Sequence, residues 1–209
     1  MAGIAALSVA VSAAATLLAA LFAVPGALWI VHGRSRLRGA LLALFAAGLG
    51  LPPVAVGLAV AFALWRSGPL GSLDALYTPA AMVVAQTIVV LPLIGTLAVL
   101  ALRGGDPTLP MQLAALGLPR GQRAALLARE VAPGLAAALL AGFGRAIAEV
   151  GAAQMTGGNI EAHTRVLTTA TMLAVGRGEF GQAFAYVAVL LGIVAVAAGT
   201  ALALQRRWA

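Results

Sequence analysis

The sequence lacks two residue types on which many functional sites depend. No cysteine occurs among its 209 residues, which excludes a disulfide, a thiolate nucleophile and a cysteine-ligated metal. Every basic residue is an arginine, so the chain has no ordinary Walker A phosphate loop, in which a lysine binds the nucleotide phosphates. The G-x-S-x-G pattern of many hydrolases is also absent. We therefore expect no catalytic residue, no metal site and no cofactor.

Charge of either sign is scarce. Only 9% of the residues are charged and 62% are hydrophobic, with a mean hydropathy of +1.04, whereas a soluble domain carries about 25% charged residues. So few charges cannot cover a soluble surface, and we expect an integral membrane protein. The net charge of +7 would suit a nucleic-acid partner. Because the arginines lie mostly in short segments between apolar runs, as in cytoplasmic loops of membrane proteins, we expect no nucleic-acid partner.

Five apolar runs are long enough to cross a bilayer. Each exceeds the roughly 20 residues that span about 30 Å of hydrocarbon as a helix. Long runs without alternation favour helices over the strands of a closed barrel. The prediction is a single all-α transmembrane domain over residues 1–209. Its five predicted spans are residues 4–31, 39–65, 79–102, 131–155 and 180–204.

The distribution of arginine predicts the orientation of these spans, because arginine-rich connections face the cytoplasm. The connections after the first and third spans and the C-terminal tail are rich in arginine, and the other two connections are poor in it or balance it with acidic residues. We predict an N-terminus outside and a C-terminus in the cytoplasm. We also expect the first span to be retained as a helix, because no basic segment precedes it as in a signal peptide. The predicted cytoplasmic arginines are Arg34, Arg36, Arg38, Arg103, Arg120, Arg123, Arg129, Arg206 and Arg207, and the outer connections hold Arg66 with Asp74, and Arg165 and Arg177 with Glu161 and Glu179.

Two further patterns within this topology bear on function. His32 and His163 fall on opposite sides of the membrane, so they cannot share a metal ion. Prolines lie inside three of the runs, at Pro25, at Pro52 with Pro53, and at Pro92. Proline kinks a helix and frees carbonyl groups. Two interpretations stay open: these prolines bend the wall of a pathway, or they reflect only the higher frequency of proline in membrane helices.

The connection between the third and fourth spans has the composition of helices rather than of a loop. Residues 103–130 contain MQLAALG, which Gly117 and Pro119 should end, and GQRAALLARE, which should form a second helix running up to Pro133. A short helix on the cytoplasmic face is a natural docking surface for a partner. A plain surface helix without a partner would show the same periodicity.

Three segments together resemble the permease subunit of importing ABC transporters, and the resemblance covers nearly the whole chain. LPPVAVGL at residues 51–58 is similar to the second core helix of molybdate-type permeases. The stretch 142–170 resembles the tungstate-type branch through its G-R-A-x-x-E-x-G core, its G-G-N-I and its T-R-x-x-T-T-A. The family's cytoplasmic E-A-A-x-x-x-G pattern is kept here only in the half that ends in glycine, with Met111, Gln112 and Leu113 in place of the EAA triplet.

This resemblance implies a MetI-like permease core in the plasma (inner) membrane that works with other chains. It implies cytoplasmic ABC ATPase subunits and an extracytoplasmic oxyanion-binding protein as partners, besides the lipid bilayer. Residues 103–130 then resemble the coupling helix that sits in a cleft of the ATPase. Because five spans enclose too little for a gated pathway, we also expect a twofold homodimer. The coupling-loop residues implied are Ala114, Ala115, Leu116, Gly117, Arg120 and Arg123.

Two opposite charges, Arg145 and Glu149, interrupt the fourth apolar run. They are four residues apart, so we expect them to share a helix face. One charge near the bilayer centre costs roughly 2.5–3.5 kcal/mol, and an exposed helical pair returns only about 0.5 kcal/mol. The pair should therefore face the bundle, a partner subunit or a water-filled path. Either Arg145 attracts an anion along its route while Glu149 orients it, or the pair locks helix packing or a dimer seam.

The polar segment after this run supplies hydrogen-bonding groups on the predicted outer side. Such groups suit a tetrahedral oxyanion or the lip of a gate, and an ordinary solvated turn is the alternative. With Arg145 and Glu149, the candidate pathway or gate residues are Thr156, Asn159, Thr164, Arg165 and Thr168.

Together these patterns predict the membrane subunit of an ABC importer for a tetrahedral oxyanion, with tungstate favoured over molybdate or sulfate by the resemblance. The chain itself would not be an enzyme, because a separate ATPase subunit would supply the nucleotide chemistry. An ATP-independent anion channel, a secondary carrier and a membrane scaffold are the alternatives from other classes.

Overall fold

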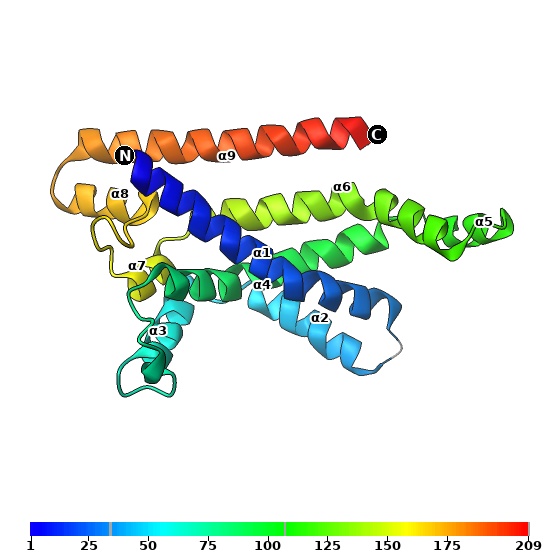
Figure 1. The fold of residues 1–209 in the computed structure, drawn as a ribbon, viewed down its shortest axis with the longest axis horizontal. Helices are drawn as coiled ribbons and strands as arrows, with labels where there is room; N and C mark the ends of the chain where they lie inside the picture. The colour runs from blue at the N-terminus through cyan, green and yellow to red at the C-terminus, as the bar shows by residue number, and fades with distance from the viewer. Residues whose placement is uncertain (34, 107, 209) are drawn as a thin grey trace.

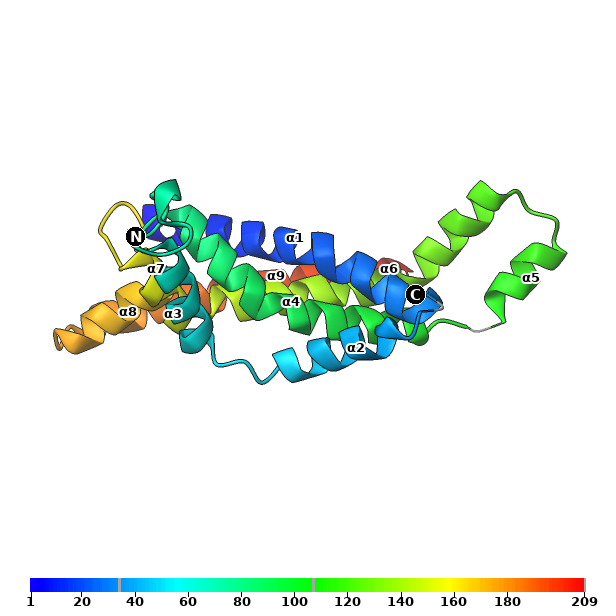
Figure 2. The ribbon, with the colours of Figure 1, turned by 90° about the horizontal axis from the view of Figure 1, so that it is seen from below.

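The computed structural model describes residues 1–33, 35–106 and 108–208, without the side chains of residues 110, 120, 201–202 and 204–208. Every regular element in these ranges is a helix, which confirms the all-helical prediction (Figure 1). Long helices run roughly along the long axis of the molecule, and most of the shorter ones lie toward its two ends (Figures 1 and 2). The long helices are α1 (Ala2–His32), α4 (Pro79–Arg103), α6 (Arg120–Ile147) and α9 (Phe180–Trp208).

Each of the long helices is apolar enough to cross a membrane, and a fifth span results if the bent pair α2–α3 counts as one. The predicted spans 4–31, 79–102 and 180–204 fall within α1, α4 and α9. The orientation of the bundle in the membrane stays a prediction, so its ends are named here by their helices, as the α5 end and the α7–α8 end.

The second predicted span is two helices rather than one. α2 (Leu37–Gly48) and α3 (Pro53–Leu64) are bent by 106° at the residues between them. Pro52 adopts an extended conformation, with φ −67° and ψ 120°, because the ring of Pro53 disfavours the helical conformation in the residue before it. Pro53 itself occupies the first turn of α3, where a missing N–H costs nothing. The bend turns α3 toward α7, and the short 3₁₀ helix η1 (Gly71–Leu73) follows it.

Of the two helices predicted in the long connection, the first forms as expected and the second extends beyond its predicted end. α5 (Leu109–Ala115) forms where it was expected, and Gly117 follows it with a left-handed φ of 68°. The second helix was predicted to stop at Pro133, but α6 begins at Arg120 and continues through Pro133 to Ile147. A proline removes one intrahelical hydrogen bond, and here the helical turns on both sides of it carry the helix across. The second predicted helix of the connection, GQRAALLARE at residues 121–130, which we call the docking segment, therefore belongs to the same helix as the start of the fourth apolar run.

The fourth predicted span, residues 131–155, is interrupted. α6 ends at Ile147, and α7 (Gly151–Gly157) begins after a break at residues 148–150. The connection predicted as an outer loop contains a further helix, α8 (Leu167–Gly176), before α9 begins. α7 ends at Gly157, and the next residue, Gly158, has a φ of 68°, at which a side chain would be strained.

α4 is the central helix of the bundle, in contact with α1, α2, α3, α6 and α7. α1 packs on α4 through a stripe of fully buried alanines. Small residues also let α6 approach α4 closely: a Cβ added to Gly142 of α6 would lie 2.5 Å from Cδ1 of Ile94 in α4. In a membrane such residues let helix backbones approach where no hydrophobic effect drives association. The alanine stripe consists of Ala15, Ala19, Ala23 and Ala27.

Candidate functional site

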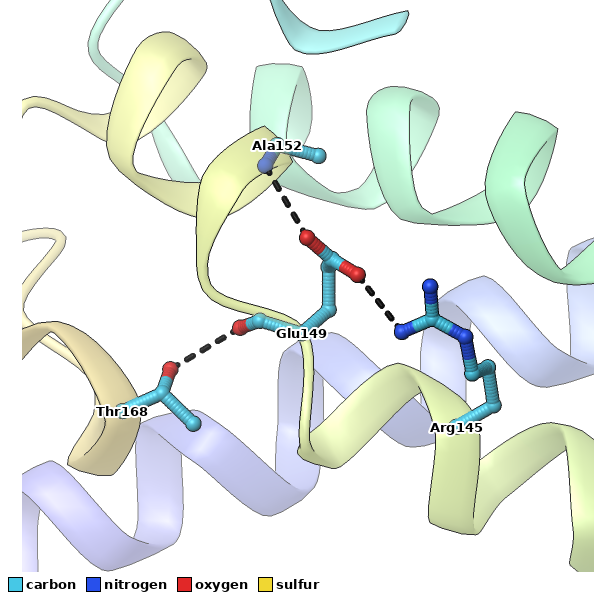
Figure 3. A network of polar contacts seen from close by, with 4 residues as sticks. All are labelled: Arg145, Glu149, Ala152 and Thr168. Carbon is cyan, nitrogen blue, oxygen red and sulfur yellow. Dashed lines mark hydrogen bonds and ion pairs between the residues drawn. The ribbon is translucent and has the colours of Figure 1, made fainter. Parts of the chain in front are cut away.

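The charged pair singled out by the sequence forms an ion pair at the α6–α7 break (Figure 3). Nη1 of Arg145, in the last turn of α6, lies 2.7 Å from Oε2 of Glu149. The two residues were expected to share one helix face, but the helix ends between them and Glu149 belongs to the break. The chain turns so that the carboxylate still reaches back to the guanidinium. The spacing thus predicted the contact correctly, although not the backbone that makes it.

Glu149 connects three elements. Its second carboxylate oxygen, Oε1, accepts a hydrogen bond from the backbone N–H of Ala152 at 3.2 Å, in the first turn of α7. Its backbone carbonyl accepts one from Oγ1 of Thr168, in α8, at 2.9 Å (Figure 3). The first N–H groups of a helix have no intrahelical acceptor, so an acidic side chain there stabilises the start of α7. With Arg145 on α6, one residue fastens α6, α7 and α8 together.

The two partners of the ion pair differ in exposure. The side chain of Glu149 is 4% exposed and that of Arg145 is 41% exposed. Of the three guanidinium nitrogens of Arg145, only Nη1 donates a hydrogen bond to an acceptor among the described residues. A guanidinium has five N–H donors in a planar fork, which suits carboxylates and tetrahedral oxyanions. Arg145 therefore presents positive charge and free donors on the exposed face of the bundle, while Glu149 holds it in place from the buried side.

The candidate threonines are buried and engaged with the backbone. Thr156 and Thr164 are fully buried and Thr168 is 6% exposed. Oγ1 of Thr156 donates to the carbonyl of Ala152 at 2.8 Å, and Oγ1 of Thr164 donates to the carbonyl of Gly157. In this conformation the hydroxyl of Thr164 helps to hold the α7–α8 connection in shape, and that of Thr156 pairs within α7. Their predicted role in a pathway or gate stays a prediction.

Arg165 is less well satisfied than Arg145. Its Nη1 lies 3.5 Å from Oε2 of Glu161, and its Nη2 lies 3.5 Å from the carbonyl of Asn159. Both distances are at the limit of a hydrogen bond or loose ion pair. Nε of Arg165 and Oδ1 of Asn159 are buried with no hydrogen-bond partner in the described part of the chain. Arg165 also lines a polar cavity of about 410 Å³ with Arg177 and Tyr186.

The predicted coupling residues lie at the other end of the molecule, around α5 (Figure 2). Ala114, Ala115 and Gly117 are exposed, and so is Leu116, at 72%. Arg123 is half-buried, and the side chain of Arg120 lies outside the described part of the structure. α5 packs mainly against α6. A cavity of about 560 Å³ separates the α5–α6 elbow from the ends of α1 and α4, with Leu28, Leu102 and Leu127 among its apolar lining.

Asp106, just before α5, is hydrogen-bonded to Thr108. Oδ1 of Asp106 accepts hydrogen bonds from the backbone N–H and from Oγ1 of Thr108, both at 2.7 Å. These hydrogen bonds stabilise the carboxylate and lower the pKa of Asp106 below its usual value. Asp106 thus stays ionised at neutral pH and pairs with Thr108 just before α5.

The structure also identifies buried polar residues that the sequence reasoning passed over. Oγ of Ser8, in α1, accepts a hydrogen bond from the backbone N–H of Leu167 at 2.8 Å and so joins α1 to α8. Gln86, in the middle of α4, is 2% exposed, and its Oε1 has no hydrogen-bond partner among the described residues. A polar amide inside the apolar run 79–102 was a signal that could have found Gln86. Ser8 carries no such signal, because its partner is distant in the chain.

No cluster of three or more histidine, cysteine, aspartate or glutamate side chains that could hold a metal ion occurs within residues 1–33, 35–106 and 108–208. His32, at the end of α1, lines a cavity with residues of α5 and α6, and His163 lines another with Met1 at the start of α1, so the two lie toward opposite ends of α1.

Comparison with known proteins gives a consistent set of relatives. The chain is similar to a probable anion ABC transporter permease protein of Haloferax volcanii, with 37% identity over 196 residues that cover 91% of this chain and 84% of that protein. It is 37% identical over 187 residues to the tungstate uptake system permease protein TupB of Peptoclostridium acidaminophilum, covering 90% of this chain and 82% of that one. A molybdenum transport system permease protein, ModB, of Mycobacterium tuberculosis is 32% identical over 172 residues, 77% of this chain and 64% of that one. No family model matches the chain.

Among solved structures, the fold is similar to that of the MetNI methionine ABC transporter in inward facing conformations. The TM-score is 0.74 and the match covers 97% of this chain and 93% of that one. At 15% identity this likeness concerns the fold alone.

Proposed function

Because the chain belongs to the permease subunits of ABC transporters for anions, we propose that it forms the membrane pathway of an importer for a tetrahedral oxyanion, with tungstate as its cargo. One observation carries the proposal: 37% identity to a tungstate uptake permease along nine-tenths of the chain. The protein is a multi-pass protein of the inner membrane and a permease rather than a nucleotide-binding subunit. Its free energy source is therefore another chain of the transporter.

In the proposed complex two copies of this chain pair about a twofold axis and bind two cytoplasmic ATPase subunits. The α5 end faces the ATPases, and its exposed Met111 and Leu116 offer apolar contacts to them. The α7–α8 end faces outward and receives the oxyanion from a binding protein. This arrangement agrees with the excess of arginine in the connections at the α5 end.

α6 supplies a direct mechanical connection between these two ends. It runs without interruption from Arg120, directly before the docking segment, to Ile147, at the break. A helix of 28 residues is roughly 42 Å long, which matches the thickness of a bilayer with its headgroups. Movement of the turn between α5 and α6 by the ATPases would therefore be transmitted along one continuous helix to the break that carries Glu149.

At the break, Arg145 provides the positive potential for a passing anion. Its guanidinium is partly exposed and has free donors, whereas Glu149 is buried and positions it. A tight, permanent anion site would slow release, so the role assigned to Arg145 is a transient electrostatic one. The neighbouring carboxylate reduces the net attraction and so suits passage better than storage.

The test is uptake into proteoliposomes that hold this chain, its co-expressed ATPase and the binding protein. Tungstate, molybdate and sulfate are offered in parallel, with and without ATP, and the internal tungsten, molybdenum or sulfur is counted. We expect ATP-dependent uptake with tungstate preferred. Flux that ignores ATP and survives removal of the ATPase would contradict the importer and indicate a channel or carrier.

Molybdate is the second candidate cargo, because the chain is 32% identical to a molybdenum transport permease. The two oxyanions have the same charge and shape, and nothing in a transient arginine contact would separate them. ATP-dependent uptake with molybdate preferred would keep the transport mechanism and change its cargo.

A further inference from the structure

Gln86 is a buried polar residue that the proposed transport site does not use. It lies in the middle of α4, the central helix of the bundle, and is 2% exposed. Its amide oxygen Oε1 is buried and accepts no hydrogen bond among the described residues. Leaving a buried acceptor unpaired is costly, and more so in a membrane, where no water replaces the missing donor. A residue of this kind in a native core requires an explanation.

The face of α4 that carries Gln86 runs along the α6–α7 break. One helical turn before it, Met82 packs against Ala153 and would lie 2.6 Å from a Cβ added to Gly157, so Met82 contacts α7. Two turns after it, Ile94 lies against Gly142 of α6. Residues on one face of a helix recur every three to four positions. Gln86 therefore lies on α4 between its contact with α7 and its contact with α6, beside the break.

The α6–α7 break has backbone N–H donors, which the amide oxygen of Gln86 lacks as partners. Ala152 donates its N–H to Glu149, but the hydrogen bonds of the described residues include none from the N–H of Val150 or of Gly151. The first N–H groups of a helix cannot be paired within it. A buried acceptor without a donor on α4 thus faces a break that has donors without acceptors. The two sets are complementary and unpaired in this conformation.

We propose that Gln86 is a positioning residue for the gate, whose amide oxygen pairs with the backbone N–H groups of the α6–α7 break in another state of the transport cycle. In this structure the break is held by Glu149 from the side of α6 and α8. A closer approach of α4 and α7 adds Gln86 as a second acceptor. The unpaired amide raises the free energy of the present state and the new hydrogen bond stabilises the other, so Gln86 biases the switch. This role rests on the proposed function, because it presupposes a transport cycle with two states.

Replacement by a side chain of similar size without the acceptor tests this role. In the reconstituted transporter, Gln86→Met should lower the maximal rate of ATP-dependent tungstate uptake by about fivefold or more, the effect of one lost hydrogen bond in the favoured state. The tungstate concentration for half-maximal uptake should stay the same, because Gln86 does not contact the anion. Thermal unfolding of the purified complex should shift upward, since a buried unpaired polar group has been removed.

Thr96 provides a matched control on the same helix. Its Oγ1 is also buried without a partner among the described residues, but it lies farther along α4 than Ile94 and away from the break. Thr96→Val removes that hydroxyl without changing the shape of the side chain. If unpaired polar groups in α4 are merely tolerated, both variants become more stable and both keep the wild-type uptake rate. That outcome would overturn the role of Gln86.

A second measurement does not depend on Gln86→Met folding. Since the chain has no cysteine, the pair Met82→Cys and Gly157→Cys reports on α4 and α7 alone. Cross-linking yield of this pair should differ between the nucleotide-free complex and the complex trapped with a non-hydrolysable ATP analogue. Equal yields in both states would show that α4 and α7 do not move relative to each other, which contradicts the proposal. Absence of ATP-dependent uptake in the wild-type complex would instead contradict the proposed function.

Discussion

The two ends of the bundle are built in opposite ways. At the α7–α8 end, polar groups are buried and hydrogen-bonded within the chain, as in the contacts of Glu149 with α6, α7 and α8. At the α5 end, apolar side chains are exposed, with Met111 at 71% and Leu116 at 72%. The first end is determined by contacts within the chain. The second has few contacts within the chain, because α5 packs mainly against α6, and the proposed function assigns its exposed surface to the ATPase subunits.

Removing Glu149 should have the largest effect on the α7–α8 end. Glu149→Ala leaves the guanidinium of Arg145 without its carboxylate and the N–H of Ala152 without its acceptor. We expect loss of uptake and a decrease of about 2 kcal/mol in the free energy of unfolding, below the 3–5 kcal/mol of a fully buried pair because Arg145 is partly exposed. Uptake at matched expression and thermal unfolding measure the two effects. Wild-type uptake in this variant would remove the ion pair from the mechanism.

The double variant Arg145→Gln with Glu149→Gln separates the two roles of this pair. It removes both charges together and keeps an amide oxygen that can accept the N–H of Ala152. If the pair only locks helix packing, uptake should recover relative to Glu149→Ala. If Arg145 attracts the anion, the double variant folds but uptake stays low.

Close packing of α3 on α7 should be the next most sensitive feature. A Cβ added at Gly57 would lie 2.7 Å from Cα of Ala152 and 3.0 Å from Cβ of Met155, so Gly57→Ala must push the helices apart. Overpacking of this kind costs about 1–3 kcal/mol, and displaced α7 should also lower uptake. Gly39→Ala, in α2, is the control, because no atom lies within 4 Å of its added Cβ. Equal melting temperatures of the two variants would contradict the packing described here.

A change at Gly117 should affect the α5 end without loosening the bundle. Gly117 has a φ of 68° and open space around it, so Gly117→Ala meets backbone strain alone, of about 1 kcal/mol. We expect a misplaced α5, normal thermal unfolding of the bundle, and less tungstate imported per ATP hydrolysed. Gly121→Ala, in α6, adds the same methyl group without a positive φ and should resemble the wild type. Loss of coupling in Gly121→Ala as well would mean that the added methyl group, rather than the strain, is responsible.

The smallest effect is expected at Asp106. Because hydrogen bonds from Thr108 lower the pKa of Asp106, the stability contributed by its carboxylate is present above the usual pKa and is lost only as the pH falls through the lowered one. Proteolysis near α5 should therefore be constant from about pH 5 to 8 in the wild type. It should be slightly faster in Asp106→Ala, and nearly normal in Asp106→Asn, which keeps an acceptor oxygen for Thr108. A change in wild-type cleavage within this pH range would contradict the lowered pKa.

Particular residues show where prediction from the sequence succeeded. α5 forms where MQLAALG predicted it and gives way to Gly117, because helix propensity and a glycine stop act within a few residues. Arg145 and Glu149 pair as their spacing suggested. Pro133 misled the prediction, because a proline predicts a helix end only when nothing beyond it continues the helix. At Pro52 and Pro53 the error was the opposite one: a single continuous span was predicted, and the chain bends there by 106°.

The membrane class, the approximate spans, the family and the presence of a charged pair in an apolar run could all be predicted from the sequence. These follow from composition, from hydropathy over about 20 residues and from short motifs, which are local properties. Three features became known only from the packed helices: α6 stops at Ile147, Glu149 joins three helices, and Gln86 lies beside the break with no hydrogen-bond partner for its Oε1 among the described residues. Those features depend on residues far apart in the chain, as in the hydrogen bond from Leu167 to Ser8 across 159 positions. Buried polar groups take whichever partner the packed bundle brings to them, and no local pattern specifies that partner.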